Sequence, residues 1–358
     1  MTIHIDKTVV GALVSRVIGV TERRTVLPIL SNVLFRLGEG QIQVIGSDME
    51  VSVVATTPYE LPRQDLSFLL PARRFYELLK EMDESDIEIE VGSTIKIRQE
   101  AAEFEFSLQD ASDFPLTHVE AEREMILRAR EFLETIEKVS FAASTDESKY
   151  VLTGIYIEAK DGILTTCATD GYRLALYSRE VTGLEPFGGV VVPKRALLEL
   201  EKLLKDGSEL ELGLGRGYMM FAFAGSRLIT RLIDETFPNY RAVLPVPTAK
   251  AECSKTALGK AVRRASIMIG KSDPIRVELS GGKIRVSSES ELGRAAETIG
   301  ADYSGVERVL HFNVRFLLDA LSHLEGEYVK IGLSSEYGPV TFEGEEANYK
   351  NIVMPVRV

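Results

Sequence analysis

The segment 169–174, which reads Thr-Asp-Gly-Tyr-Arg-Leu, combines side chains that could transfer protons. Asp170 directly follows Thr169, and a carboxylate so placed could act as a general acid or base. Catalysis would also need a histidine, a second carboxylate or a glycine-rich phosphate loop at a fixed offset, and the sequence places none there. Asp48 holds the equivalent position in an earlier copy of the pattern, which favours a structural role in a turn. We therefore predict no catalytic residue here and no enzymatic activity for the chain.

Candidate ligands for metals and cofactors are equally sparse. The two cysteines, Cys167 and Cys253, lack metal-ligand spacing, so we interpret both as buried small residues. No Gly-x-x-x-x-Gly-Lys-Ser/Thr run marks an ATP site. We predict neither a metal nor a cofactor. The alternative of a nuclease or phosphoryl transferase would require acidic residues that converge on Mg²⁺, and it would be supported if alanine at Asp170 abolished a metal-dependent turnover.

One pattern occurs three times along the chain and consists of two strand-like runs joined by a glycine turn. The turns lie at Gly40, Gly162 and Gly282, separated by 122 and 120 residues. The predicted openings of the second helix in each copy repeat these steps, at Pro71, Pro193 and Asn313. Two independent landmarks with one period indicate a threefold repeat of whole domains. Such a repeat favours an extended or ring-shaped scaffold over a single catalytic pocket.

Each copy has the same order of predicted elements: a short strand, an amphipathic helix, the glycine-turned strand pair, a second helix and further strands. The six predicted helices cover Val9–Ile18, Pro71–Met82, Arg130–Phe141, Pro193–Leu204, Lys255–Ile267 and Asn313–Leu324. Two helices with about eight strands per copy predict an α+β fold, with helices on one face of antiparallel sheet. We place the three domains at residues 1–119, 120–246 and 247–358.

The net charge of the chain is −12, which by itself argues against a nucleic-acid partner. The distribution of charge changes that conclusion. Six windows around the predicted helices together carry +11, so the remaining segments carry −23; the windows are 7–24, 70–82, 128–140, 193–205, 255–271 and 311–324. We interpret this as a basic helical face set against an acidic exterior. The alternative is that the helices merely hold exposed lysines and arginines for solubility.

The sequence also predicts a compartment. No run of 18 apolar residues is long enough to cross a membrane, and the N-terminus Met1–Ile5 lacks the basic start and apolar stretch of a secretory signal. With two cysteines in different copies, these features predict a soluble protein of the reducing cytoplasm without a membrane partner.

Several short motifs, in their order and spacing, resemble one known family along the whole chain. They are Thr25–Leu30, Ala168–Leu174, Phe237–Arg241 with Leu244 and Pro245, Phe312–Val314, and Val353–Arg357. The family is that of the β sliding clamps of bacterial replicative DNA polymerases. The resemblance implies a DNA-clamp fold and a head-to-tail homodimer whose domains form a closed ring. It further implies that the ring encircles double-stranded DNA at the nucleoid, without reading its sequence, and makes the polymerase processive.

The resemblance implies a hydrophobic pocket for short peptide motifs. Through it the ring would bind the replicative polymerase catalytic subunit, the clamp loader ATPase, and other polymerases and repair proteins. The assigned pocket residues are Lys149, Val151, Leu152, Thr169, Gly171, Tyr172, Arg173, Leu174, Pro238, Val243, Asn313, Phe316, Val340, Ile352, Val353, Met354, Pro355, Val356 and Arg357. The sequence departs from the family pattern at Lys149 and Ala242 (arginines), at Tyr172 (histidine), and at the small Val356 and Val358. We expect the pocket to persist with a changed ranking of ligands.

Two further surfaces follow from the resemblance. At the dimer interface Phe106 and Leu108 would meet Ile267 and Met268, although period-2 alternation equally allows all four to lie in domain cores. The residues assigned to the DNA-facing lumen are Arg24, Arg73, Tyr150, Lys194, Lys202, Lys260, Arg263 and Arg264. A separate alternative is an acidic scaffold that binds only proteins. Retention on circular but not linear DNA would exclude it.

Overall fold

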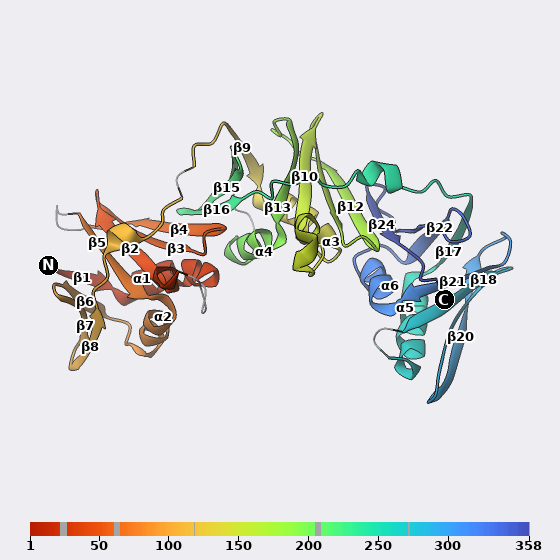
Figure 1. Ribbon diagram of the computed structural model, residues 1–358, viewed down its shortest axis with the longest axis horizontal. Coiled ribbons are helices and arrows are strands. Elements are labelled where there is room, and N and C mark those ends of the chain that lie inside the picture. The colour runs from red at the N-terminus through yellow and green to blue at the C-terminus, as the bar shows by residue number, and fades with distance from the viewer. Residues whose placement is uncertain (22–26, 61–64, 118, 205–208, 271–272, 358) are drawn as a thin grey trace. The chain divides into compact units, whose positions relative to one another are not determined.

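The computed structural model describes residues 1–21, 27–60, 65–117, 119–204, 209–270 and 273–357. In these residues the chain forms six α-helices and 24 β-strands, two helices and eight strands in each copy (Figure 1). Helices pack on antiparallel sheets, so the predicted α+β class is confirmed. The chain divides into two compact units, Met1–Arg130 with Arg195–Leu232, and Glu131–Lys194 with Ile233–Val358. The predicted domain boundaries cut the chain differently and stay a prediction.

The six helices lie where the sequence predicts them, with ends shifted by a few residues. In the first, the Asp6 carboxylate accepts a hydrogen bond from the Thr8 amide at 2.7 Å and so caps the helix. The helices are α1 (Lys7–Val17), α2 (Ala72–Glu81), α3 (Ala129–Ser140), α4 (Lys194–Leu203), α5 (Lys255–Ala265) and α6 (Val314–Ser322).

Two prolines lie outside the helices that they were expected to open. Pro71 ends strand β5 (Leu66–Pro71) and directly precedes α2, and Pro193 ends β13 (Phe187–Pro193) before α4. The proline ring fixes φ near −65°, and the φ of −58° at Pro71 lets the chain pass from strand to helix at that residue.

The first unit contains two sheets. One has the strand order β1-β6-β7-β8, so β8 is an edge strand. The other has the order β5-β2-β3-β4-β16-β15-β14-β9, with α1 and α2 packed against it. Its core includes the Phe35 ring, which stacks on Phe68 at 5.0 Å. The other strands are β1 (Thr2–Asp6), β2 (Asn32–Gly38), β3 (Gln41–Ser47), β4 (Val51–Pro58), β6 (Asp86–Val91), β7 (Thr94–Gln99), β8 (Ala102–Ser107), β9 (Arg123–Arg128), β14 (Glu209–Gly215), β15 (Tyr218–Phe223) and β16 (Ser226–Arg231).

The second unit is built on one twelve-stranded sheet. Its order is β13-β10-β11-β12-β24-β23-β22-β17-β20-β19-β18-β21. Helices α5 and α6 pack together, α5 mainly on β19 and β20 and α6 on β21 and β24. Its strands besides β13 are β10 (Gly154–Lys160), β11 (Ile163–Thr169), β12 (Arg173–Glu180), β17 (Ala249–Ser254), β18 (Pro274–Ser280), β19 (Lys283–Ser290), β20 (Gly293–Asp302), β21 (Arg308–Asn313), β22 (Tyr328–Leu333), β23 (Val340–Glu343) and β24 (Tyr349–Val353).

The threefold repeat is visible in the hairpins. The turn glycines Gly40, Gly162 and Gly282 have φ of 73°, 76° and 75°, a region that L side chains rarely adopt. These turns join β2 to β3, β10 to β11 and β18 to β19. The same left-handed conformation at one period explains why glycine recurs there.

One copy joins the next through paired edge strands. β4 of the first copy pairs antiparallel with β16 of the second, and β12 of the second pairs with β24 of the third. In the first junction Val51 lies opposite Thr230, and in the second Arg173 lies opposite Val353. Each junction removes two exposed strand edges, which would otherwise invite non-specific pairing.

Both cysteines are buried, as the sequence predicts. Burial raises the pKa of the Cys167 thiol far above its usual range, and it raises that of Cys253 to about 12. Both groups are therefore neutral thiols at pH 7. In the described part of the chain, no helix is long and apolar enough to cross a membrane.

Candidate peptide pocket

The second unit contains an apolar cavity of about 550 Å³. Its floor and walls come from the end of β11, the start of β12, the segment 238–245, and the C-terminal strand β24. The lining residues are Leu152, Thr169, Gly171, Tyr172, Arg173, Leu174, Pro238, Asn239, Tyr240, Ala242, Val243, Leu244, Pro245, Ser334, Pro339, Ile352 and Met354. This volume and lining suit a few hydrophobic side chains of an extended peptide.

Strand pairing holds the two sides of the cavity together. Leu174 on β12 lies opposite Ile352 on β24, and both belong to the buried cluster beneath the cavity. The chain leaves β24 along the pocket wall, where the Met354 amide donates to the Tyr172 carbonyl at 2.8 Å. The C-terminal segment is therefore a fixed part of the wall.

The segment 169–173 forms a hydrogen-bonded turn. Asp170 Oδ1 accepts from the amides of Tyr172 and Arg173 at 2.9 and 3.1 Å, and Thr169 Oγ1 donates to the Arg173 carbonyl at 2.6 Å. Gly171 has φ of 92°, which favours glycine at the tip. Asp170 thus orders the loop that lines the cavity, in agreement with the predicted structural role.

The first copy contains the same turn. There the Asp48 carboxylate accepts from the amides of Glu50 and Val51 at 3.0 and 2.7 Å. The equivalence of Asp48 and Asp170 is confirmed at the level of hydrogen bonds. Among the described residues, no group of three or more His, Cys, Asp or Glu side chains is placed to hold a metal ion.

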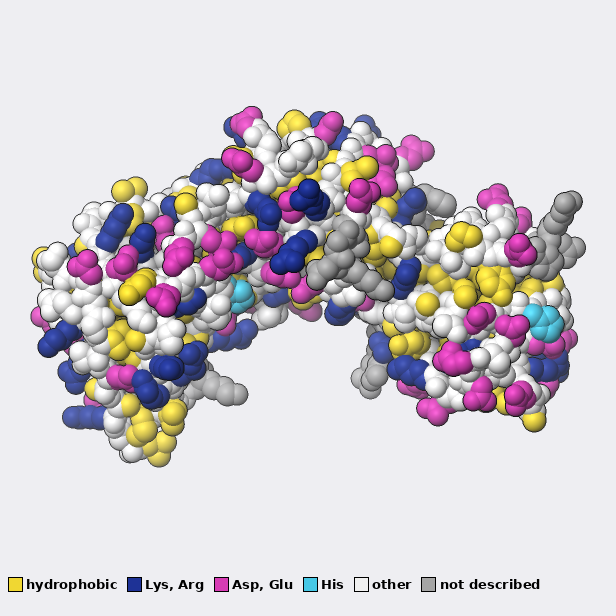
Figure 2. Space-filling view, turned by 180° about the vertical axis from the view of Figure 1, so that it is seen from behind, with side chains coloured by type: hydrophobic (Ala, Val, Ile, Leu, Met, Phe, Trp, Pro, Cys, Tyr) yellow, Lys and Arg dark blue, Asp and Glu magenta, His cyan; other side chains and the backbone are white. Residues whose placement is uncertain are grey.

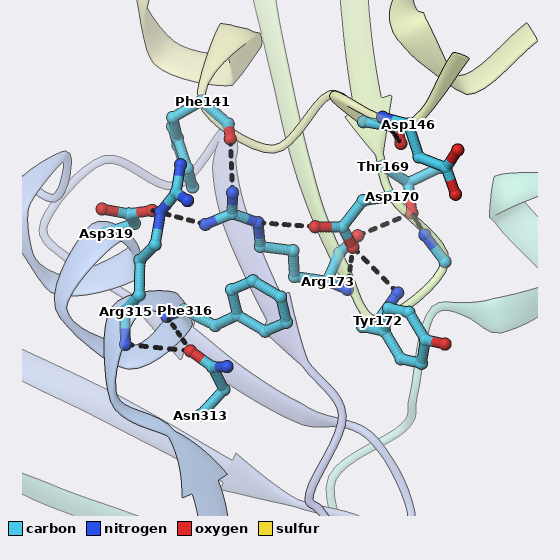
Figure 3. A network of polar contacts seen from close by, with 12 residues as sticks. Phe141, Asp146, Thr169, Asp170, Tyr172, Arg173, Asn313, Arg315, Phe316 and Asp319 are labelled. Atoms are coloured by element: carbon cyan, nitrogen blue, oxygen red, sulfur yellow. Dashed lines mark hydrogen bonds and ion pairs between the residues drawn. The ribbon is translucent and has the colours of Figure 1, made fainter. Parts of the chain in front are cut away.

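Arg173 connects this turn to α6 (Figure 3). Its guanidinium contacts Asp170 Oδ2 at 3.0 Å and Asp319 Oδ2 at 2.5 Å, and it donates to the Phe141 carbonyl at 2.6 Å. The same group lies 4.4 Å from the centre of the Phe316 ring. With its side chain 5% exposed, Arg173 is a buried cation with two carboxylate partners.

The structure gathers about half of the predicted pocket residues around the cavity. The predicted residues that line it are Leu152, Thr169, Gly171, Tyr172, Arg173, Leu174, Pro238, Val243, Ile352 and Met354. Of the others, Val151 packs on the cluster beneath, Val340 and Val353 are buried, and Phe316 with its cap Asn313 lies behind Arg173. Pro355 and Val356 line a second cavity of about 340 Å³ with His311 and Tyr337, and Arg357 lies 6.0 Å from the Tyr337 ring.

Lys149 and Tyr172, two departures from the family pattern, interact with each other. The Lys149 ammonium lies 4.8 Å from the centre of the Tyr172 ring and donates to the Asp170 carbonyl at 3.2 Å. Tyr172 is 59% exposed. A cation on the aromatic face holds this ring at the rim of the cavity.

Seven lining residues are not among the residues assigned to the pocket from the sequence, and they lie in two segments of the chain. They are Asn239, Tyr240, Ala242, Leu244, Pro245, Ser334 and Pro339. Asn239, Tyr240, Leu244 and Pro245 belong to the motif on which the family resemblance rests, and Ala242 was named only as a departure from the family pattern. Tyr240 is 5% exposed, and burial beside Glu158 raises its pKa above the usual range. Ser334 and Pro339 carry no pattern that could have identified them.

The predicted lumen residues lie on several helices. On α5, Lys260, Arg263 and Arg264 are exposed, and Arg264 pairs with Glu297. Elsewhere Tyr150 is 46% exposed, Lys202 pairs with Glu199 at 2.8 Å, and Arg73 donates to the Thr21 carbonyl at 3.3 Å. Burial, together with the nearby Arg173 and Arg315, lowers the pKa of Lys194. Arg24 lies outside the described residues.

The four predicted interface residues are at the surface. Leu108 is 44% and Ile267 is 76% exposed, while Phe106 and Met268 are half-buried. None is a fully buried core residue, which was the alternative. Figure 2 shows hydrophobic side chains gathered at the lower left tip of the molecule, where the β19–β20 hairpin ends. Leu292 in this turn is 83% exposed.

Family models and curated relatives match nearly the whole length of the chain. Models of the N-terminal, central and C-terminal domains of the DNA polymerase III beta subunit match residues 1–118, 126–239 and 241–357. The chain is 31% identical to the beta sliding clamps of Proteus mirabilis and Escherichia coli K12, with 94% of each chain covered.

Comparison with solved structures points to the same family. The DNA polymerase III subunit beta of Pseudomonas aeruginosa matches with a TM-score of 0.94 at 28% identity, over 100% of both chains. A sliding clamp of Bartonella birtlesii, solved bound to griselimycin, matches with a TM-score of 0.92 at 27% identity, over 100% of both chains. The resemblance found in the motifs is thereby confirmed, and the chain belongs to the family of DNA polymerase III beta subunits, the bacterial sliding clamps.

Proposed function

We propose that this protein is a homodimeric ring that encircles double-stranded DNA and tethers the replicative polymerase to it. The observation that carries the proposal is the strand-to-strand junction, which occurs twice in the chain and leaves one matching pair of edges unused. Among the described residues, β8 pairs on one side only, with β7. β20 pairs along its length with β19, and on its other side only Ala301 and Asp302 pair, with β17. Two chains joined head to tail through β8 and β20 would close a ring of six similar domains.

Apolar side chains flank the proposed junction. Phe106 and Leu108 on the β8 side would cover Ile267 and Met268, which lie beside β20: the Met268 carbonyl accepts from Ser290 Oγ in the adjacent hairpin at 2.5 Å. We propose the predicted boundaries, 1–119, 120–246 and 247–358, as the three domains of each subunit. The first two family models, residues 1–118 and 126–239, fall within the first two proposed domains, and the third, residues 241–357, begins six residues before the third proposed domain.

The charge of the helices supports a DNA-facing lumen. The exposed cations of α5 can approach phosphates, and lysine and arginine contacts to phosphates are independent of sequence. Such contacts are replaceable and screened by salt, so they permit sliding. The closed ring, not affinity, would supply persistence on DNA. We propose that the protein has no catalytic activity of its own and works in the cytoplasm at the nucleoid.

Retention on closed DNA tests the ring. Loaded onto nicked circular DNA by a clamp loader, the protein should stay bound through gel filtration at 0.5 M NaCl, a salt concentration of roughly this order being enough to screen phosphate contacts. Linearising the same DNA should release it. Equal retention on both forms would indicate ordinary binding, and no retention on either would favour the acidic scaffold that binds only proteins.

We propose that the apolar cavity takes hydrophobic side chains of short peptide motifs. The partners would be the replicative polymerase catalytic subunit, the clamp loader ATPase, and other polymerases and repair proteins. The cavity's apolar lining and its polar rim at Tyr172 and Lys149 support this use. A sliding clamp of Bartonella birtlesii was solved bound to griselimycin, and we therefore choose griselimycin as the probe of this cavity.

Truncating two side chains of the cavity should weaken binding. In a Val243→Ala, Met354→Ala double variant, we expect the Kd for griselimycin to rise by at least about tenfold, because burial of each methylene contributes about 0.8 kcal/mol and losing only two such groups already corresponds to about tenfold. Isothermal titration calorimetry measures the change. Val246→Ala is the matched control, since Val246 is 83% exposed and does not line the cavity. An unchanged Kd in the double variant would place the binding site elsewhere.

A further inference from the structure

We propose that the ring selects its own subunit through an ion pair between Glu105 on β8 and the partner's Arg294 on β20. The inference rests on the proposed head-to-tail ring. It adds which residues lie opposite each other where β8 of one subunit pairs with β20 of the next, a junction that we call the seam, and which charges favour that register. Both residues are exposed, Glu105 on the edge strand β8 and Arg294 in the part of β20 that, among the described residues, pairs with β19 alone. Three observations lead to it: the register of the internal junctions, the faces of the two strands, and the order of charges across them.

The register follows from the repeat. The glycine-turned hairpins align Val51 on β4 with Arg173 on β12 and Gly293 on β20, at the steps of 122 and 120 residues. Val51 lies opposite Thr230 on β16. The two-residue turns at 100–101 and 224–225 align β16 with β8 and place Phe106 where Thr230 stands. By this equivalence Phe106 faces the partner's Gly293, and Glu105 faces the partner's Arg294.

The same register brings matching faces together. Phe104 and Phe106 lie opposite the buried Ile97 and Ile95 of β7, so they point toward the apolar side of the sheet. Glu105 therefore points outward, toward solvent. On β20 the burial alternates, with Arg294 on the exposed face. Glycine opposite Phe106 leaves room for the ring, and a shift by one residue would turn Phe106 into solvent.

The charges across the seam then alternate without a break. Within one chain, Arg294 lies opposite Glu289 on β19 and contacts it at 2.7 Å. Glu105 lies opposite Lys96 on β7, and Lys96 lies opposite Glu90 on β6. Joining β20 to β8 in the derived register gives Glu289, Arg294, Glu105, Lys96 and Glu90 in one row across five strands. Opposite charges on neighbouring strands stabilise a pairing, and like charges oppose it.

The two internal junctions lack such a pair. At the equivalent positions, Ser52 faces Ile229 in the first junction and Leu174 faces Ile352 in the second. Both strands of each internal junction belong to the same chain, so no charge pair is needed to select the partner strand. The seam joins separate chains, so it has to favour β20 over other partner strands. Its charges disfavour the pairing of two β8 strands, because that pairing would bring Glu103 and Glu105 of each chain together. Repulsion of this kind is a common device for specificity.

Charge reversal with complementary mixing tests the pair. Glu105→Arg and Arg294→Glu should each raise the dimer dissociation constant by at least about tenfold, because a like-charged pair then stands at both seams. An equimolar mixture of the two variants should recover the wild-type constant, since both seams of the mixed dimer regain opposite charges. The double variant Glu105→Arg, Arg294→Glu should recover it alone. Sedimentation velocity over a dilution series measures all four.

Matched controls separate this pair from net charge. Lys283→Glu changes the same strand pair at its far end, opposite Gly300, and Glu124→Arg places its charge opposite Gly213 on β14. Both controls should keep the wild-type constant. Dimeric single variants with an unchanged constant would overturn the ion pair and leave the ring standing. A wild-type protein that is monomeric at micromolar concentration would overturn the ring itself.

Discussion

Replacing Phe106 by aspartate should convert the protein to a monomer and abolish its retention on closed circular DNA. In the proposed seam the Phe106 ring is covered by the partner, and burying a phenylalanine contributes about 1.5–3 kcal/mol. The aspartate would also place a carboxylate without a partner in an apolar contact, beside the like charge of Glu105. A head-to-tail dimer contains the change twice. Each 1.4 kcal/mol lost raises the dimer dissociation constant about tenfold, so a loss of several kcal/mol raises it by orders of magnitude and the ring opens.

Sedimentation velocity and retention on nicked circular DNA measure the effect together. Ile163→Asp is the matched control, because Ile163 is 39% exposed at the β10–β11 turn and belongs to neither strand of the proposed seam. The control should stay dimeric and retained. Circular dichroism should show a folded Phe106→Asp monomer, since β8 is an edge strand. A Phe106→Asp protein that still dimerises with wild-type affinity would contradict the placement of the seam.

The repeat could be predicted from the sequence because it depends on backbone conformation. A two-residue turn with φ near +75° strongly favours glycine, so Gly40, Gly162 and Gly282 mark the copies in the sequence itself. The six helices were predictable for a similar reason, since apolar residues at helical spacing mark each buried face. These local signals do not show how the copies join. The pairing of β4 with β16 links residues about 175 positions apart, and only side-chain packing and edge pairing decide it.

The part of the candidate pocket that could be predicted from the sequence is the wall formed by one continuous segment, residues 169–173. The turn at 169–173 closes on its own backbone, so its residues belong together in the sequence and in space. Ser334 and Pro339 reach the cavity only through the folding of the third copy, and their types are common in any loop. Phe316 was assigned to the pocket wall but supports it from behind, because the Arg173 guanidinium lies over its ring.

Removal of the Arg173 side chain should strongly destabilise the fold. Arg173→Ala should lower the free energy of unfolding by about 3–5 kcal/mol, the usual result of removing one partner from a buried ion pair. Alanine would leave the Asp170 and Asp319 carboxylates, 14% and 29% exposed, without their shared cation. The Phe141 carbonyl would lose its donor as well. Because Asp170 orders the turn that lines the cavity, griselimycin binding should fall with stability. Urea denaturation and calorimetry on the same samples measure both.

Two variants distinguish the guanidinium from charge alone. Arg173→Lys keeps the cation but cannot contact both carboxylates and the Phe141 carbonyl with one planar group, so it should recover only part of the loss. Arg315→Ala is the control, because this 72% exposed side chain contacts Asp319 only at 3.6 Å, and exposed pairs contribute about 0–1 kcal/mol. If Arg173→Ala unfolded at the wild-type urea concentration, the network would be dispensable for the fold. If it lost stability but bound griselimycin normally, the turn would be ordered without Arg173, and Asp170 with Thr169 would suffice to shape the pocket.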